Sequence, residues 1–286
     1  MIFIIFCLIL LLFSYIYYQC KWAKEVKQDI YSKKIKNKIK ITQISDFHSN
    51  KLKNMEYFKE KILEFNPDFI ILTGDINDYG EEKKFNRAID FLEKLSKLEI
   101  KTYYITGNHE EAGPMLDEFI EKIKRLGIKY LKNEGEYLKI RDENIYIYGI
   151  SYNNFSLKNY QTKDENLNII LSHFSKNIRD NLDDTMDIIF SGHTHGGQVR
   201  FPFLGALLAP GEGYFPKFDK GLFKYKNSQI YIDSGLGNTF MDLRFLNRIQ
   251  FSNITIIANS LMVKQKCPKL KIGVQFLFGV PKNRLK

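Results

Sequence analysis

The chain has 286 residues, a hydrophobic content of 44% and a net charge of +10, and its length allows one or two domains with a sizeable core. The charge lies in two flanks: residues 21–40 hold eight lysines and two acidic residues, and residues 260–286 hold seven basic residues and no acidic one. The body from residue 41 to 259 therefore has a net charge of −3. This excludes the main electrostatic support for nucleic-acid binding, so we expect no nucleic-acid partner.

The N-terminus predicts a membrane anchor. Residues 1–18 contain no charged side chain and, as a helix, would be about 27 Å long, close to the thickness of the hydrocarbon layer. A cleaved signal peptide is the alternative, but no basic start and no small-residue cleavage site is present. We interpret residues 1–20 as a single-pass transmembrane anchor and residues 21–38 as a basic juxtamembrane linker. The lysines that follow the anchor predict a cytoplasmic body near anionic lipids.

From residue 39 the hydrophobic pattern alternates between strands and helices. Strands are predicted at 39–44, 68–72, 102–105, 137–140, 144–150, 167–171, 186–190, 222–225, 229–232 and 250–257. Helices are predicted at 55–65, 82–98, from Pro114 to about 126, and near 176–181. This order predicts a layered α/β body with mixed sheets, spanning residues 39–259.

All five histidines follow predicted strands, next to glycine or a carboxylate. The blocks are Asp46-Phe47-His48, Gly74-Asp75-Ile76-Asn77-Asp78, Gly107-Asn108-His109-Glu110, Ser172-His173 and Gly192-His193-Thr194-His195. A single histidine at a strand end is usually a surface residue, but α/β sheets place ligand sites beyond the carboxyl ends of their strands. Imidazole, carboxylate and amide donors suit Mn, Zn or Fe better than Ca or Mg. The donors are too many for one ion; two ions bridged by one carboxylate would use them, hold a phosphoryl group and activate a water.

These blocks, in this order, resemble the calcineurin-like metallophosphoesterase family over roughly residues 39–257. The resemblance implies a sandwich of two mixed β-sheets flanked by helices, and a phosphoesterase with two divalent metal ions. One ion would be held by Asp46, His48 and His195, the other by Asn108, His173 and His193, with Asp75 bridging both. His109 would face the phosphate as the catalytic residue. Asp78 and Glu110 would orient ligands, with surface carboxylates as the alternative.

The segments after the last histidines are similar to a membrane-anchored bacterial branch of this family, in blocks such as residues 192–202 and 235–238. This similarity implies a membrane lipid or lipid-linked substrate such as UDP-diacylglucosamine. The alternatives are a soluble nucleotide or general phosphodiesterase of the same fold, and a catalytically idle membrane-anchored scaffold.

Three segments bear on substrate and membrane contact. Residues 201–210 are too apolar for a solvated loop and could line an acyl groove, touch the bilayer, or form a buried strand and turn. Arg200 and Arg244, and also Arg248, could pair with a second phosphate, although single arginines are usually surface residues. The basic tail, residues 260–286, could lie on an anionic membrane or add an edge strand. The sequence predicts no oligomeric state.

Overall fold

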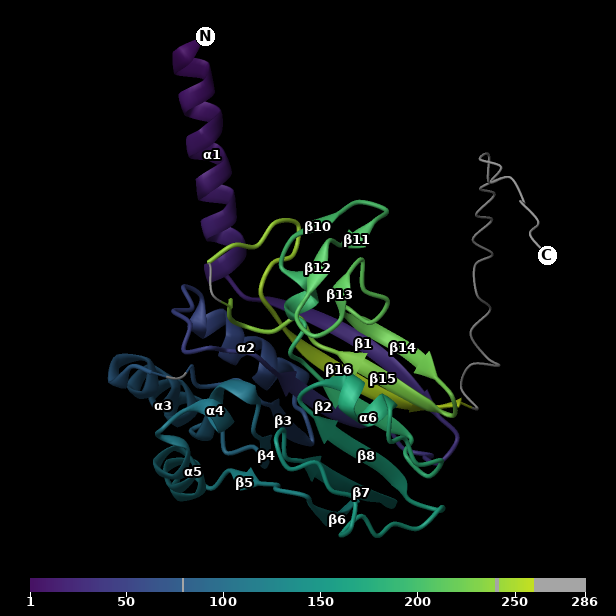
Figure 1. Cartoon of the computed structure of the whole chain (residues 1–286). Coiled ribbons are helices and arrows are strands. Elements are labelled where there is room, and N and C mark those ends of the chain that lie inside the picture. The colour runs from purple at the N-terminus through teal and green to yellow at the C-terminus, as the bar shows by residue number, and fades with distance from the viewer. Residues whose placement is uncertain (79, 240–241, 260–286) are drawn as a thin grey trace, which may run out of the picture.

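The computed structural model describes residues 1–78, 80–239 and 242–259. Its body is built on two six-stranded mixed sheets (Figure 1). The first has the order β1, β16, β2, β3, β4, β5, formed by Lys24–Ser32, Gln250–Ala258, Ile39–Ile44, Phe69–Thr73, Thr102–Ile105 and Lys129–Tyr130. The second has the order β14, β15, β9, β8, β7, β6, formed by Gly221–Tyr225, Ser228–Ile232, Ile188–Ser191, Leu167–Ser172, Glu143–Ile150 and Glu134–Ile140.

The two sheets pack face to face because their central strands are apolar on both sides. In β3, Phe69 and Ile71 face the second sheet, while Ile70 and Leu72 face the helices outside. Strands β2 to β5 run parallel, as do β15, β9, β8 and β7. Within each parallel set, the carboxyl ends of the strands meet at one edge of the sheet.

Helices cover the outer face of the first sheet. The helices of the body are α2 (Met55–Phe65), α3 (Glu82–Ser96), α4 (Asn108–Ala112), α5 (Leu116–Arg125) and α6 (Ser175–Arg179). Helix α3 buries Phe85, Ala88, Leu92 and Leu95 at helical spacing, and α2 and α5 pack their apolar stripes into the same cluster. The predicted fold class, two mixed sheets flanked by helices, is confirmed, and the predicted strands and helices lie within a few residues of those observed.

Half of the predicted linker, residues 21–38, is a strand instead. Residues 24–32 form strand β1, which pairs in parallel with β16 at the edge of the first sheet. Lys27 and Asp29 are exposed there while Ile30 is fully buried. An edge strand keeps one side in solvent and so tolerates charged residues, which is why a lysine-rich segment can still join a sheet. The body therefore begins at residue 24 rather than 39.

The apolar N-terminus forms helix α1 (Ile2–Lys21), which projects from the body (Figure 1). It is apolar over nearly its whole length, and within it only Gln19 and Cys20 at its end are buried. Its length and composition are sufficient to cross a membrane. The predicted basic tail, residues 260–286, lies outside the described residues.

Residues 200–214 lie outside the two main sheets, in the connection between β9 and β14 of the second sheet. They form four two-residue strands: β10 (Arg200–Phe201), β11 (Gly205–Ala206), β12 (Leu208–Ala209) and β13 (Gly213–Tyr214). Ala206 and Ala209 are buried, but Phe203 and Leu204 are exposed, which excludes the fully buried strand and turn. We call residues 200–215 the β10–β13 excursion.

Candidate metal centre

Loops at the carboxyl ends of β2, β3, β4, β8 and β9 carry every candidate metal ligand. Asp46 and His48 follow β2, Asp75 follows β3, and His173 follows β8 directly. The edges of the two sheets meet here. A hydrogen bond shows the contact: the backbone N–H of His193, which follows β9 of the second sheet, donates to both carboxylate oxygens of Asp46, which follows β2 of the first, at 3.0 and 3.1 Å. The fold thus brings together all the residues that the motifs predicted to act as ligands.

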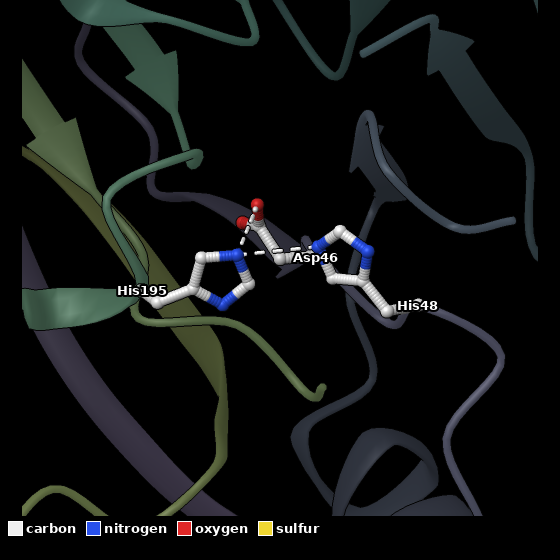
Figure 2. Close-up of side chains that lie close together, drawn as sticks. All are labelled: Asp46, His48 and His195. Atoms are coloured by element: carbon white, nitrogen blue, oxygen red, sulfur yellow. Dashed lines mark hydrogen bonds and ion pairs between the residues drawn. The ribbon is translucent and has the colours of Figure 1, made fainter. Parts of the chain in front are cut away.

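The first group consists of Asp46, His48 and His195 (Figure 2). The Nε2 atoms of His48 and His195 are 3.2 Å apart, and Nε2 of His195 is 3.6 Å from a carboxylate oxygen of Asp46. Burial lowers the pKa of His48 to about 4 and, together with the charges of His48 and Arg244, holds the pKa of His195 well below its usual range. Both imidazoles are therefore neutral at pH 7 and offer lone pairs to a cation.

The second group consists of Asp75, His173 and His193, with Asn108 beside them. Nε2 of His173 is 3.2 Å from Nδ1 of His193, 3.2 Å from a carboxylate oxygen of Asp75 and 3.1 Å from the amide oxygen of Asn108. Burial lowers the pKa of His173, but the charge of Asp75 and its hydrogen bond outweigh burial and raise that pKa to about 10. The position thus attracts positive charge, which suits a cation.

Asp75 lies between the groups. The carboxylate oxygen that faces His173 is also 3.6 Å from Nε2 of His48, which belongs to the first group. The expected bridging position of Asp75 therefore has a geometric basis. Imidazole, carboxylate and amide donors converging in this way fit divalent ions such as Mn, Zn or Fe.

His109 stands at the rim of the groups rather than inside them. Its side chain is 21% exposed, and its Nδ1 is 2.8 Å from a carboxylate oxygen of Asp78. Burial lowers the pKa of His109, but the hydrogen bond to Asp78 and the charges of Asp75 and Asp78 outweigh burial and raise that pKa. His109 can therefore hold a proton at a position open to a substrate. His48, Asp78 and His109 also lie close enough to form a third possible metal group.

Glu110 fixes the backbone of two loops that carry candidate ligands. Its buried carboxylate accepts hydrogen bonds from the backbone N–H groups of Asp75, Ile76 and Asn77, at 2.9, 2.6 and 3.0 Å. It also accepts one from the N–H of Gly107, at 2.9 Å. One carboxylate thus joins the loop after β3 to the loop after β4. It supports the ligands through their backbone and is not a surface residue.

The loops approach each other so closely that two positions, 107 and 192, have room only for glycine. A Cβ atom at Gly107 would overlap the carboxylate of Asp75, and one at Gly192 would overlap the side chains of Ser45 and Asp46. Any larger residue at either position would push a candidate ligand out of place.

The structure corrects the prediction for Arg244. This side chain is fully buried and donates to the carbonyls of Ser234 and Gly237, at 2.7 and 2.6 Å, and to the Ser234 hydroxyl at 2.9 Å. A buried guanidinium with these partners has no surface to offer a substrate phosphate, so the predicted substrate contact is wrong. Arg244 instead supports His195: its guanidinium donates to the His195 carbonyl at 3.4 Å and lies 3.3 Å from Nδ1 of the His195 ring.

The other two arginines also have partners within the protein. Arg200 donates to the carboxylate of Asp219 at 2.5 Å and to the carbonyl of Gly196 at 2.9 Å, but its side chain remains 19% exposed. Its predicted contact with substrate stays a prediction. Arg248 donates to the carbonyls of Trp22 and Ala23, at the base of α1.

Sequence reasoning missed Phe174. Its ring centroid lies 4.5 Å from that of His193, so it supports this imidazole from one side. The only signal in the sequence is its position directly after His173.

Comparisons with known proteins show the family to which the chain belongs. Residues 39–197 match the family model described as calcineurin-like phosphoesterase. The metallophosphoesterase YkuE of Bacillus subtilis is 28% identical over 226 residues, covering 76% of this chain and 78% of that protein. The phosphodiesterase YaeI of Escherichia coli is 27% identical, covering 70% and 76%.

Two further similarities are more distant. A transmembrane protein with a metallophosphoesterase domain from Danio rerio is 25% identical, covering 77% of this chain and 53% of that protein. The crystal structure of TT1561 of Thermus thermophilus has a TM-score of 0.46 at 10% identity, covering 70% of this chain and 91% of that one.

Proposed function

Because the chain belongs to the calcineurin-like phosphoesterase family and is a metal-dependent phosphoesterase, we propose that it hydrolyses a phosphodiester or pyrophosphate bond in a membrane lipid or lipid-linked nucleotide. UDP-diacylglucosamine is the specific substrate that we propose. We also propose that α1 spans the membrane once and that the body lies on its cytoplasmic side.

The proposed catalysis uses two cation sites that share Asp75. Two divalent ions held there would polarise the phosphoryl group and lower the pKa of the attacking water. Asp46, His48 and His195 would hold one ion, and Asn108, His173 and His193 the other. The charge of Asp75 would serve both sites, because its carboxylate lies within 3.6 Å of His48 and 3.2 Å of His173.

His109 would complete the reaction as a general acid. Asp78 accepts a hydrogen bond from Nδ1 of the protonated ring and orients it, so that Nε2–H can reach the leaving oxygen. The raised pKa of His109 favours this protonated form. The same imidazolium would stabilise negative charge that develops on the phosphoryl group.

The observation that carries the lipid proposal is an apolar cavity next to the metal loops. It has a volume of about 230 Å³ and is lined by Gly197, Val199, Leu207, Leu208 and Leu243, together with the polar side chains of Gln198 and Thr239. Gly197 ends the short 3₁₀ helix that starts at His195, so the cavity begins two residues from a candidate ligand. Apolar walls beside a phosphate site suit a substrate with a hydrocarbon portion.

The test is a substrate panel. Full-length protein loaded separately with Mn, Zn or Fe is incubated with UDP-diacylglucosamine, phospholipids, nucleotides and an aryl phosphodiester, with Asp75→Asn as the inactive control. We expect release of UMP and diacylglucosamine phosphate from the first substrate. Hydrolysis of soluble esters or nucleotides alone would reject the lipid proposal and support the soluble phosphodiesterase alternative.

A further inference from the structure

The end of α1 is fixed to the body by its own backbone. The carbonyls of Gln19, Cys20 and Lys21, which a free helix end would leave without partners, accept from Ile249 N–H, Asn50 Nδ2 and Lys53 N–H, at 3.0, 3.0 and 2.9 Å. Arg248 donates to the next two carbonyls, of Trp22 and Ala23, at 2.6 and 2.8 Å. Strand β1 then starts at Lys24. No flexible linker separates α1 from the sheet, so the direction of α1 determines which surface of the body faces a membrane.

The length of α1 sets the depth at which that surface lies. Its 20 residues give a helix of about 30 Å, so nearly the whole helix is needed to cross the hydrocarbon layer. Tyr15, Tyr17, Tyr18 and Trp22 gather at the end next to the body, as aromatic residues do at a membrane interface. The last turn of α1 therefore lies at the membrane interface, and Tyr15 lies one to two turns deeper, at the edge of the hydrocarbon layer.

The body reaches the level of these turns. The ring centroid of Tyr15 is 5.8 Å from that of Phe245, which is 6.3 Å from that of Phe201 in β10. Tyr15 lies six residues before the end of α1, a rise of about 9 Å. The start of the β10–β13 excursion therefore lies near the edge of the hydrocarbon layer whenever α1 spans a bilayer.

The side chains around this contact are apolar and exposed. We call them the apolar rim: Phe201, Phe203, Leu204, Tyr214, Phe215 and Leu246, with exposed fractions from 42% to 108%. Figure 1 shows β10 and β11 at the end of the body from which α1 projects. Five of the six lie within residues 201–215, and exposed apolar side chains concentrated on one segment in this way indicate an interaction site.

We propose that the apolar rim inserts into the same bilayer leaflet that receives the end of α1, as a second membrane contact of the body. The proposal rests on the membrane insertion of α1. The bilayer is the occupant because the rim is continuous with α1 through Phe245 and Tyr15, so lipid that surrounds α1 must also meet the rim.

The segment that carries the rim also contacts the metal centre. Gly197 packs against Ala206 of β11, and Gly211 packs against the ring of Phe174, which contacts His193. The excursion that carries most of the rim thus rests directly on the loops of the candidate ligands.

The experiment uses full-length protein in vesicles and a single tryptophan as a depth probe. In a Trp22→Phe background, which removes the only native tryptophan, Phe203→Trp reports the rim, Phe6→Trp reports α1, and Tyr137→Trp is the matched exposed control on β6. Emission is compared in vesicles of plain and of acyl-brominated phosphatidylcholine, and with iodide in the buffer. Phe203 is fully exposed, so its replacement leaves packing intact.

We expect bromolipid to quench Phe6→Trp and Phe203→Trp strongly and to leave Tyr137→Trp unchanged, whereas iodide quenches only Tyr137→Trp. If Phe6→Trp is quenched by bromolipid but Phe203→Trp is quenched by iodide, the rim is in water and this proposal is overturned while the anchor stands. If Phe203→Trp is protected from both quenchers, another protein copy covers the rim, which also overturns it. If Phe6→Trp escapes bromolipid, the anchor itself is rejected, and this proposal with it.

Discussion

Five candidate ligands have backbone in the left-handed region, which costs a residue with a side chain roughly 1–2 kcal/mol. They are Asp46, His48, Asp75, His193 and His195, with φ from 45° to 70°. Such strain persists only when the surroundings hold it, as the Glu110 carboxylate does for the backbone of Asp75. The ligand atoms are therefore held in position by the loops that carry them, and side-chain substitutions at this site test chemistry more directly than folding.

We predict that Asp75→Asn removes most phosphodiesterase activity, because the substitution takes one negative charge from both metal groups at once. The expected loss of kcat/KM on an aryl phosphodiester is on the order of 100-fold or more, and bound metal measured by atomic emission falls with it. Asp90→Asn is the matched control, since Asp90 is 59% exposed and pairs only with Lys94 among the described contacts. Unchanged metal content with full activity would reject the bridging role.

We predict that Asp78→Asn moves the basic limb of the pH–rate profile to lower pH. The Asp78 carboxylate stabilises the protonated form of His109, so its removal lowers the pKa of His109 and the catalytic proton is lost at lower pH. The measurement is kcat against pH for both proteins at saturating metal. Metal content should be unchanged. An unshifted limb would exclude His109 as the proton donor, and lost metal would place Asp78 and His109 in the third metal group.

The candidate donor residues could be picked out from the sequence because each follows a strand and donor chemistry depends on residue type, whereas their division between two ions came from the family resemblance. Arg244 could not, because a charged residue is normally on the surface and nothing local shows that Ser234 and Gly237 enclose it. Glu110 was only partly predicted. Its place next to His109 indicated support for the ligands, but the four N–H groups that it accepts come from two loops whose meeting depends on the fold.

At the scale of elements, length and periodicity decided what could be predicted. Helices α2, α3 and α5 and the buried strands repeat their pattern over enough residues to be recognised. Strand β1 was misinterpreted because its lysines hide a weak alternation, and only pairing with β16, more than 200 residues away, makes it a strand. The strands β10 to β13 have two residues each, which is too short for any periodic signal.

We predict that Gly211→Ala reduces activity more than Gly213→Ala. Both glycines have positive φ, so both substitutions carry the same backbone strain, but only a Cβ at Gly211 overlaps Phe174. Because Phe174 packs on His193, its displacement shifts a candidate ligand, and we expect a loss of roughly 10-fold in kcat/KM. Equal activities of the two variants would show that the excursion does not position His193.

At the scale of the whole molecule, the anchor, the rim and the metal centre are linked by direct contacts. Asn50, which bonds the last turn of α1, is two residues from His48, and the excursion touches the loops of His193 and His195. The sequence separates these parts by up to two hundred residues. Anchor and motifs could each be predicted alone, but their proximity depends on β1 and β16 lying side by side, which no local pattern reveals.

We therefore predict that the double variant Phe203→Ser, Leu204→Ser separates membrane-bound from soluble substrates. Loss of two inserted apolar side chains weakens contact with the bilayer, and we expect hydrolysis of UDP-diacylglucosamine in vesicles to fall about 10-fold or more. Hydrolysis of a soluble aryl phosphodiester should stay within about twofold, since neither side chain is part of the metal groups. Tyr137→Ser, which removes an exposed ring from β6, should change neither rate. If both rates of the double variant fell equally, the rim would act through the shape of the metal centre and not through the bilayer.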